Sequence, residues 1–304
     1  MIQHLKHDQI DKWKWDETIK HSFNGTIYAY SWYLDIVCPG WEALIKNDHE
    51  YIMPLTIGKK YGVEYIYPPF FAQQLGIFSN SKMEEGVTEE FLKAIPEKFK
   101  YKEINLNKFN KYSGKDFNIK KNMNHELDLI HPYEKIFKNY SENTQRNIKK
   151  AKKNELGIIK GITIKELIKL FRSNRGKEVE AMKEKHYITL KALVDFCIIN
   201  GSATLWGVIT KSGDLCAGAV FMRSNDRIIF LFSGLSEEGK KLGAMFLLLD
   251  KYIHDHSELP IVFDFEGSND KDLARFYKSF GSKESVYLQV KKNDLPTLLK
   301  WLKN

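Results

Sequence analysis

A glycine-punctuated loop from Gly234 to Gly243 is the first segment whose residue types suggest chemistry. It precedes an apolar stretch, 244–256, which predicts a helix. Backbone N–H groups at the glycine-rich start of a helix form an anion site, and the helix dipole favours negative charge there. The loop is therefore either a phosphate site or an ordinary strand-to-helix connection that Gly243 closes. As a donor-binding site it would use Ser233, Gly234, Lys240, Gly243 and Ala244.

A basic helix is expected after Ser141, which offers an N-cap together with Thr144. Helical spacing places Ile148 and Ala151 on the inner side and turns Arg146 and the neighbouring lysines outward. This outer side is either a phosphate-binding surface or a solvated lysine face. Among its cations, Arg146 is the candidate substrate-binding residue.

The segment Pro68-Pro-Phe-Phe-Ala-Gln-Gln-Leu-Gly76 combines paired aromatic residues with paired amides. Such residues in a non-regular segment suit contact with a ligand, and they suit equally well the sealing of an interface between domains. On the first interpretation, Gln73 and Gln74 bind substrate.

Several common kinds of site are absent from the sequence. The pairs His4/His7 and His254/His256 have no cysteine or carboxylate cluster at a spacing that would complete a metal site, so we expect no metal. No Gly-x-Ser-x-Gly elbow, Walker loop or Gly-x-Gly-x-x-Gly motif occurs. These absences argue against a hydrolase, an NTPase and a dinucleotide-binding fold.

Composition indicates a folded chain of two domains. The 304 residues are about twice the length of a typical domain, and 43% hydrophobic with 13% aromatic residues can fill sizeable cores. The net charge of +8 comes almost entirely from lysine, since arginine occurs at only a few positions. Solvated lysine faces explain this charge more simply than specific phosphate recognition, for which arginine is the preferred residue; a polyanionic partner is the alternative.

The sequence predicts a cytoplasmic protein without a membrane span. Its longest apolar run, 242–249, is far shorter than the roughly 18 residues that cross a bilayer. The N-terminus carries charge where a signal peptide would be apolar. Cys38, Cys197 and Cys216 form no close pair, which suits reduced thiols.

The two halves of the chain repeat one order of elements: helix, three-stranded meander, loop, helix, strand, connection, strand. In the second half the expected helices and strands are 163–173, 189–199, 203–210, 216–222, 228–233, 244–256, 261–265, 270–279, 285–291 and 295–302. In the first half they are 8–22, 41–46, 51–57, 64–67, 87–99, 103–106 and 126–129, while 107–124 is polar and unassigned. An internal duplication with a junction near His131 explains this repetition.

This order resembles the GNAT acyltransferase fold, and two copies in tandem resemble the FemABX-like peptidyl and aminoacyl transferases. Three segments carry the resemblance. Asn143-Thr-Gln-Arg-Asn-Ile-Lys-Lys-Ala151 is similar to an arginine-bearing helix near the start of the family's second domain. Phe263-Asp-Phe-Glu-Gly267 is similar to its penultimate strand and turn, and Phe276-Tyr-Lys-Ser-Phe-Gly281 to its closing motif.

The resemblance implies catalytic roles. In GNAT enzymes a tyrosine four residues before the closing glycine protonates the leaving thiolate, and Tyr277 has that spacing from Gly281. In the FemABX-like pattern a lysine follows the phenylalanine and stabilises charge on the reacting carbonyl; here Tyr277 follows Phe276 and the lysine is Lys278. In the GNAT phosphate-loop pattern, Lys240 and Gly243 fit two positions and Met245 occupies the third.

The expected fold is α/β of the α+β type, with two GNAT-like domains, 1–131 and 132–304, each a mixed, mostly antiparallel sheet flanked by helices. The apolar terminal segment 294–304 is expected to pack back on the first domain. The expected function is transfer of an acetyl or similar acyl group from acyl-CoA to a small-molecule or peptide amine, without a tightly bound cofactor. Tyr277, Lys278 and Asp264 are the catalytic candidates, Asp264 being alternatively a structural strand-end residue, and Phe276 joins the substrate-binding candidates.

Two other functions fit the same sequence. One is aminoacyl transfer from charged tRNA to a peptide amine, as the FemABX-like resemblance implies. The other is a catalytically silent protein that keeps the fold and a ligand groove, which Met245 and the position of Lys278 favour. The acceptor and the oligomeric state do not follow from the sequence, because fold alone does not fix function.

Overall fold

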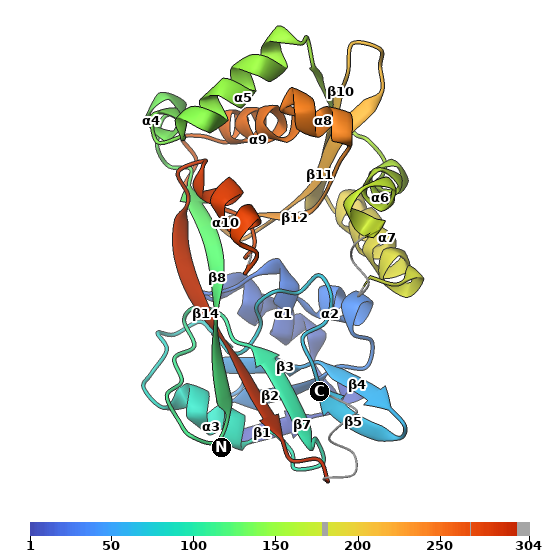
Figure 1. Cartoon of the computed structure of the whole chain (residues 1–304). Coiled ribbons are helices and arrows are strands. Elements are labelled where there is room, and N and C mark those ends of the chain that lie inside the picture. Colours follow the sequence, from blue (N-terminus) through green and yellow to red (C-terminus); the bar gives the residue numbers. More distant parts are fainter. Residues whose placement is uncertain (178–181, 268, 297–304) are drawn as a thin grey trace. The chain divides into compact units, whose positions relative to one another are not determined.

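The computed structural model describes residues 1–177, 182–267 and 269–296. It divides into two compact units, of which unit 1 is Met1–Met123 with the residues from Val286 onward, and unit 2 is Asn124–Ser285. Both borders fall inside a long strand, β8 (Asn118–Asp128) and β14 (Lys283–Asn293) (Figure 1). The division predicted at residue 131 placed all of β8 in the first domain and all of β14 in the second. It did so because a border inside a continuous strand leaves no turn or linker signal.

Unit 1 begins with a small antiparallel sheet of strand order β1-β2-β3-β6. Helix α1 packs Trp15 and Ile19 into the interior, and its N-cap Asp11 accepts a hydrogen bond from Lys14 N–H. The elements of this part are β1 (Ile2–Leu5), η1 (His7–Gln9), α1 (Lys12–His21), η2 (Ile27–Ala29), α2 (Ser31–Val37), β2 (Glu42–Lys46), β3 (Tyr51–Leu55) and β6 (Phe78–Ser79).

A second sheet in unit 1 has the order β4-β5-β7-β14. Its elements are β4 (Ile57–Lys60), β5 (Val63–Ile66), β7 (Tyr101–Asn105) and β14, and α3 (Val87–Lys93) contributes Phe91 to the core of the unit. The predicted three-stranded meander is therefore wrong for the first half. The chain leaves the first sheet at Thr56, whose hydroxyl donates to the carbonyl of Tyr67, and β4 pairs in the second sheet.

Unit 2 is built on one sheet, in the order β14-β8-β13-β12-β11-β10-β9. From β8 to β9 its strand pairs are antiparallel, except for the parallel pair β12/β13. The meander β10–β11–β12 and the helices around it agree closely with the sequence-based prediction. The elements are α4 (Tyr133–Lys138), α5 (Glu142–Lys153), β9 (Gly157–Lys160), α6 (Ile164–Ser173), η3 (Arg175–Lys177), α7 (Glu184–Ile199), β10 (Ala203–Ile209), β11 (Leu215–Ser224), β12 (Arg227–Leu235), α8 (Glu237–Leu242), α9 (Ala244–Asp255), β13 (Val262–Asp264) and α10 (Lys271–Lys278).

Three glycines lie side by side across the sheet of unit 2, because Gly207 pairs with Gly218 and Gly218 with Gly234. A Cβ on Gly218 would lie 2.7 Å from Ile162 and 3.1 Å from Leu167, and one on Gly234 would lie 3.1 Å from the backbone nitrogen of Phe171. The row of glycines therefore provides the space into which α6 and the residues before it pack.

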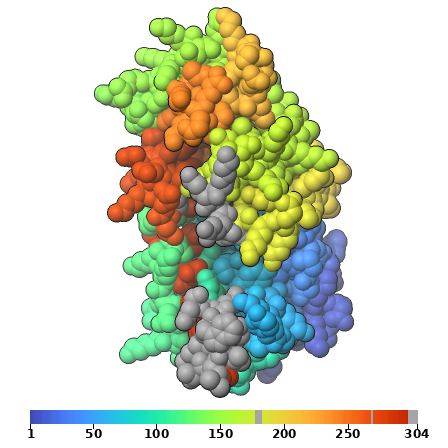
Figure 2. Space-filling model, turned by 45° about the vertical axis from the view of Figure 1, so that its right-hand side comes forward, coloured from blue at the N-terminus to red at the C-terminus, as the bar shows by residue number. Residues whose placement is uncertain are grey.

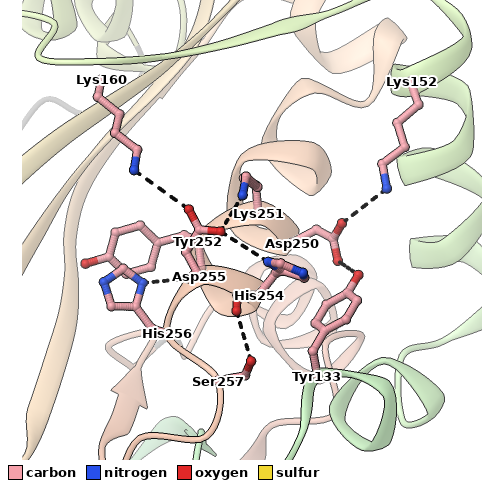
Figure 3. Close-up of polar contacts among 10 residues, drawn as sticks. All are labelled: Tyr133, Lys152, Lys160, Asp250, Lys251, Tyr252, His254, Asp255, His256 and Ser257. Carbon is pink, nitrogen blue, oxygen red and sulfur yellow. Dashed lines mark hydrogen bonds and ion pairs between the residues drawn. The ribbon is translucent and has the colours of Figure 1, made fainter.

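Helix α9 lies against strands β10 and β11 through its own aromatic residue. Tyr252 stacks on Phe221, with ring centroids 3.6 Å apart, and meets Trp206 edge-on at 4.9 Å. The same helix buries Asp250, to which Tyr133 of α4 donates a hydrogen bond of 2.7 Å, while Lys152 of α5 lies 3.9 Å away on the other side (Figure 3). Burial raises the pKa of Asp250. Through Asp250, Tyr133 connects α4 to α9 and Lys152 connects α5 to α9.

Other sequence-based predictions have mixed outcomes. The loop 234–243 contains a short helix, α8, which Ser236 caps by accepting from Gly239 N–H. Strand β8 begins at Asn118, within the segment left unassigned. Most of the predicted helix 295–302 lies outside the described residues; before them, Asp294 N–H donates to the carbonyl of Lys100 in unit 1 and Leu295 is buried.

Within the described part of the chain, no helix is both long and apolar enough to cross a membrane. No group of three or more histidine, cysteine or acidic side chains there has a geometry that could hold a metal ion. Cys38, Cys197 and Cys216 are buried free thiols, and burial raises the pKa of each to about 11.

Two glycines with left-handed backbone allow a matched stability test. Gly243 joins α8 to α9 with φ +82°, and a Cβ there would lie 2.7 Å from the carbonyl oxygen of Asn147 in α5. Gly213, with φ +89°, has open space around the same position. Asparagine tolerates this backbone conformation. We therefore expect Gly243→Asn to lower the free energy of unfolding by about 1–3 kcal/mol and Gly213→Asn by less than about 1 kcal/mol, measured by urea denaturation. Equal losses would contradict the close packing of Gly243 on α5.

Candidate functional site

The central feature of unit 2 is the point at which two parallel strands separate. The pairing of β12 with β13 joins Arg227 to Val262, Ile228 to Phe263 and Ile229 to Asp264, and ends there. Strand β12 continues to Leu235 and stays paired with β11. Beyond Ile229, the edge of β12 that faces β13 therefore has no paired strand among the described residues. Unpaired backbone N–H groups of an opened strand are hydrogen-bond donors for a ligand.

A buried ionic cluster joins the strands where they separate. The Arg227 guanidinium donates to Asp264 Oδ2 at 2.6 Å and to Glu126 Oε1 at 2.9 Å. These three residues come from β12, β13 and β8. Although burial opposes the charge, the two carboxylates hold the pKa of Arg227 above its usual value. Removal of one partner from such a cluster typically costs about 3–5 kcal/mol, because the remaining charge is left buried.

Asp264 also shapes the turn that follows β13. Its second oxygen, Oδ1, accepts a hydrogen bond of 2.8 Å from the backbone N–H of Glu266. Glu266 has φ +57°, a conformation that costs free energy for a residue with a Cβ. The contacts of Asp264 are thus those of a strand-end residue, and its side chain is enclosed. The side chain of Glu266 is half-buried.

Tyr277 of α10 lies at the separation of the strands. Its ring centroid is 6.4 Å from that of Phe230 on β12 and 5.2 Å from that of Phe265, which follows β13. The residue is only 8% exposed, so its side chain lies almost entirely inside unit 2. The capping of α10 by Asp270, which accepts from the N–H groups of Asp272 and Leu273, fixes where the helix begins.

Charged groups surround the position of Tyr277. Burial raises its pKa, the Glu266 carboxylate raises it further, and the Arg175 guanidinium lowers it. Arg175, which follows α6, lies 3.4 Å from Asp270 at the start of α10. A tyrosine with a raised pKa keeps its proton at neutral pH, so it is available as a proton donor.

His125 of β8 lies on the other side of Tyr277, with ring centroids 5.9 Å apart. It is fully buried, and neither ring nitrogen has a hydrogen-bond partner within the described residues. Glu284 lies 4.0 Å from its Nε2 and also forms an ion pair of 2.9 Å with Lys278. Lys278 is 52% exposed, so its side chain points away from the buried Tyr277.

Phe276 packs rather than facing open solvent. Its ring meets Phe246 of α9 at 5.0 Å and Phe280 at 5.3 Å, both edge-to-face. Phe276 and Phe280 are thus the i,i+4 packing pair that their spacing allows. Through Phe246, this pair holds α10 against the first turns of α9.

The glycine loop is packed closely against neighbouring backbone. The Cβ position of Gly239 is occupied by the carbonyl of Cys216, and that of Gly243 is limited by Asn147. Ala244 is buried, and α9 starts directly where α8 ends. The carbonyl end of α8 therefore adjoins the amide end of α9, which weakens the anion site that a helix N-terminus would otherwise offer. Gly234 is covered by α6, Ser233 is half-buried beside it, and Lys240 is exposed.

Arg146 lies on the outer side of α5, exposed, with one hydrogen bond of 3.5 Å to Asn143. Lys149, Lys150 and Lys153 are exposed on the same side, at spacings of three, four and seven residues. Among the described residues, no carboxylate forms an ion pair with any of these four cations. They form a cationic stripe, which we call the α5 stripe.

The two glutamines belong to unit 1, where they stabilise the loop that contains them. Gln74 Nε2 donates to Gln73 Oε1 at 2.9 Å, and Gln74 Oε1 accepts from the backbone N–H of Lys108. The carbonyl of Gln73 accepts from Asn105. In the same loop, Phe71 has φ +67°, and the hydroxyl of Tyr33 donates to its carbonyl.

The structure thus places His125 and the charge of Arg175 near Tyr277, and it joins Arg227 and Glu126 to Asp264. The sequence singled out none of these four residues. The sequence does not reveal that Arg227 binds both Glu126 and Asp264, because the three residues are far apart in the chain. His125 follows the polar part of β8, where asparagine and lysine give little strand signal. The cluster depends on strand pairing, which sequence spacing does not reveal.

No family model and no curated protein matches the chain. Solved structures do. FemX is similar over 98% of this chain and 99% of its own, with a TM-score of 0.67 at 14% identity. A tandem GNAT protein from the clavulanic acid biosynthesis pathway is similar over 98% and 100%, with a TM-score of 0.55 at 10% identity. L-PGS from Bacillus licheniformis is similar over 86% and 87%, with a TM-score of 0.52 at 12% identity.

The chain has a tandem GNAT fold. The similarity to FemX and to the tandem GNAT protein confirms the predicted fold class and the predicted resemblance to both groups. At these identities the shared property is the fold, so the chemistry of this tandem GNAT protein must be argued from its own residues.

The buried His125 makes stability depend on pH in a defined direction. Burial lowers its pKa, Glu284 opposes that shift, and Lys278 adds to it, whereas an unfolded histidine titrates near about 6.5. Because the unfolded chain takes up the proton first, the contribution of His125 to stability is lost as pH falls from about 7. We expect the free energy of unfolding to fall less steeply between pH 7 and 5 in His125→Phe than in the wild type, by up to about 1.4 kcal/mol per pH unit. Parallel pH curves would contradict a neutral buried imidazole.

Proposed function

We propose that unit 2 transfers an acyl group from an activated ester or thioester to an amine. The observation that carries this proposal is the position of Tyr277, a protonated and nearly buried acid between two separating strands. Acyl transfer requires a polarised carbonyl, a neutral amine and a proton for the leaving group. The unpaired edge of β12 supplies backbone N–H donors near Ser233 and Gly234, and Tyr277 supplies the proton.

The proposed steps balance without a further reagent. The amine nitrogen attacks the carbonyl carbon, and a C–N bond forms as the C–O or C–S bond to the carrier breaks. Tyr277 gives its proton to the departing oxygen or sulfur. The amine proton then returns to the phenolate, so the net transfer is of one acyl group to nitrogen and one proton to the carrier.

Other residues near Tyr277 act through position and charge. Asp264 holds the turn at Glu266 by its backbone hydrogen bond and is itself held by Arg227, which makes it a positioning residue in this proposal. Glu266 is the carboxylate with the largest effect on the pKa of Tyr277, which it raises. Lys278, paired with Glu284 and half-exposed, has no part in these steps.

The carrier of the acyl group is proposed to be RNA, and the α5 stripe supports this assignment. Four unpaired cations on one side of α5 suit a chain of phosphates. Lys240 lies on α8, whose end at Gly243 packs against Asn147 of α5, so it extends the same cationic surface. The resemblance of the sequence to the FemABX-like transferases implies the same kind of carrier.

Acyl-CoA is the second candidate carrier. It is favoured by Tyr277, because a phenol at the separation of the strands suits protonation of a thiolate, as the GNAT resemblance implies. The closed packing of Gly239 and Gly243 weighs against it, since a pyrophosphate needs close approach to backbone amides that are here next to the end of α8.

Tyr277→Phe tests the proposed acid. The substitution removes one hydroxyl and leaves the packing of the ring. The urea midpoint should therefore stay near the wild-type value. Turnover of a working donor should fall by roughly 10²–10⁴-fold in kcat, the usual worth of a positioned acid. Lys278→Ala is the matched control on the adjacent residue and should change turnover by less than about threefold. Unchanged turnover in Tyr277→Phe would refute the assignment.

Removal of the α5 stripe separates the two carriers. The quadruple variant Arg146→Gln/Lys149→Gln/Lys150→Gln/Lys153→Gln should weaken binding of an RNA acceptor-stem hairpin, measured by fluorescence anisotropy. It should also reduce the slope of log K against log salt by about 3–4, since each phosphate contact contributes about 0.9. Turnover of acyl-CoA, if any, should not depend on these four cations.

The control for net charge is a variant with the same loss of four cations in unit 1, Lys59→Gln/Lys82→Gln/Lys111→Gln/Lys115→Gln, all of which are exposed. It should leave the salt slope unchanged. Equal losses in the two variants, or acyl-CoA turnover without RNA binding by the wild type, would move the assignment to acyl-CoA.

A further inference from the structure

Helix α7 has isoleucine on the side that faces away from the interior of unit 2. Its inner side buries Tyr187, Leu190, Leu193, Val194 and Cys197. On the opposite side, Ile188 is 64% exposed, Ile199 is 83% exposed, and Ala192 between them is exposed as well. Spacings of four and seven residues place these three on one side of the helix. A surface helix normally has polar residues there, so this stripe requires an explanation.

Cations border the apolar stripe. On α7 itself, Lys185 is exposed and Lys191 is half-exposed. Lys165, Lys169 and Arg172 project from the adjoining helix α6, with which α7 forms a groove. The yellow-green and yellow atoms of α6 and α7 form much of the face of unit 2 turned toward the reader in Figure 2.

The groove consists of two adjoining cavities of about 580 Å³ each, which share Lys165. One is lined by Ile168, Lys169 and Tyr187, and the other by Lys191, Ile198 and Trp206. Each therefore combines apolar side chains with lysine. Because both cavities lie along α7, the apolar stripe and the cationic groove form one surface, which we call the α6/α7 face.

The positive charge of the α6/α7 face is only partly neutralised. Arg172 pairs with Glu184 at 3.0 Å, and Lys191 pairs with Asp195. Among the described residues, neither Lys165 nor Lys169 has an acidic partner within ion-pair distance. Long lysine side chains can bury their stems on apolar surface while their ammonium groups reach a separate layer of negative charge.

We propose that the α6/α7 face docks on an anionic lipid bilayer. An apolar stripe of about three helical turns with lysines beside it matches a helix that lies in the plane of the membrane interface, with isoleucine toward the acyl chains and lysine at the headgroups. The isoleucines supply apolar contact with the acyl chains, and the lysines supply attraction to the anionic headgroups, so both contribute to binding. This inference does not depend on the acyl-transfer proposal.

A second copy of the chain fits the face less well. In a symmetric dimer the same patch meets itself, so Lys165 and Lys169 would approach the equivalent cations of the other copy. A bilayer that contains anionic lipid has the complementary charge over a wide area instead.

Vesicle flotation with the full chain tests the proposal. Wild-type protein should float with vesicles of phosphatidylcholine and phosphatidylglycerol at a 3:1 ratio and not with pure phosphatidylcholine, and 0.5 M salt should release it. Ile188→Ser/Ile199→Ser and Lys165→Glu/Lys169→Glu should each lower the partition coefficient at least tenfold. Circular dichroism and the urea midpoint establish that each variant is folded.

Matched controls make the same changes away from the α6/α7 face. Ile130→Ser/Val286→Ser removes two other exposed apolar side chains, and Lys111→Glu/Lys115→Glu reverses two other exposed lysines. Both should float like the wild type. The proposal is overturned if wild-type protein does not bind the anionic vesicles, if the controls lose as much binding as the α6/α7 variants, or if Ile188→Ser/Ile199→Ser instead converts a dimer into a monomer by light scattering.

Discussion

The structure of unit 2 depends on Arg227 being held between Glu126 and Asp264. Arg227 is the first residue of β12 paired with β13, and its side chain reaches Asp264 at the last pair and Glu126 of β8, with hydrogen bonds of 2.6 and 2.9 Å that connect the three strands. A buried charge without partners would be very costly, so the three side chains must stay together. The cluster thus holds β12 and β13 together over their three paired residues, and β12 continues beyond them without β13, which leaves an edge available to a ligand.

Tyr277 acquires its properties from that opening. The rings of Phe230 on β12 and of Phe265 directly after β13 pack against it, and burial raises its pKa. Asp264 connects the ionic cluster to this site, because it binds Arg227 with one oxygen and the strained turn at Glu266 with the other. Asp264 therefore also holds the backbone of Glu266, the carboxylate that most raises the pKa of Tyr277. The cost of the left-handed backbone at Glu266 is offset by this hydrogen bond.

The sequence predicts the second half of the fold well and the first half less well, for physical reasons. The meander β10–β11–β12 has short apolar strands and clear turns, so local signals suffice. Strand β8 starts with lysine and asparagine, and only its pairing makes it a strand. Gly234 shows why the function of the loop could not be predicted from the sequence. A glycine before a helix suggests phosphate binding, whereas the strand pairing places Gly234 beside Gly218 and Gly207, in a row that makes room for α6. The closing motif makes Tyr277 a candidate, whereas no motif points to Arg227 or His125.

The junction of α8 and α9 affects which groups of unit 2 can bind negative charge. A helix N-terminus attracts anions only where its first amides are approachable and no opposing dipole lies beside it. Here Gly243 brings α9 directly after α8 and against Asn147 of α5, so backbone amides are a poor anchor for phosphate. The exposed cations are instead side chains, on α5 and α8. Side-chain cations suit a long, repetitive polyanion better than one compact pyrophosphate, because they spread charge over a surface rather than focus it on a point.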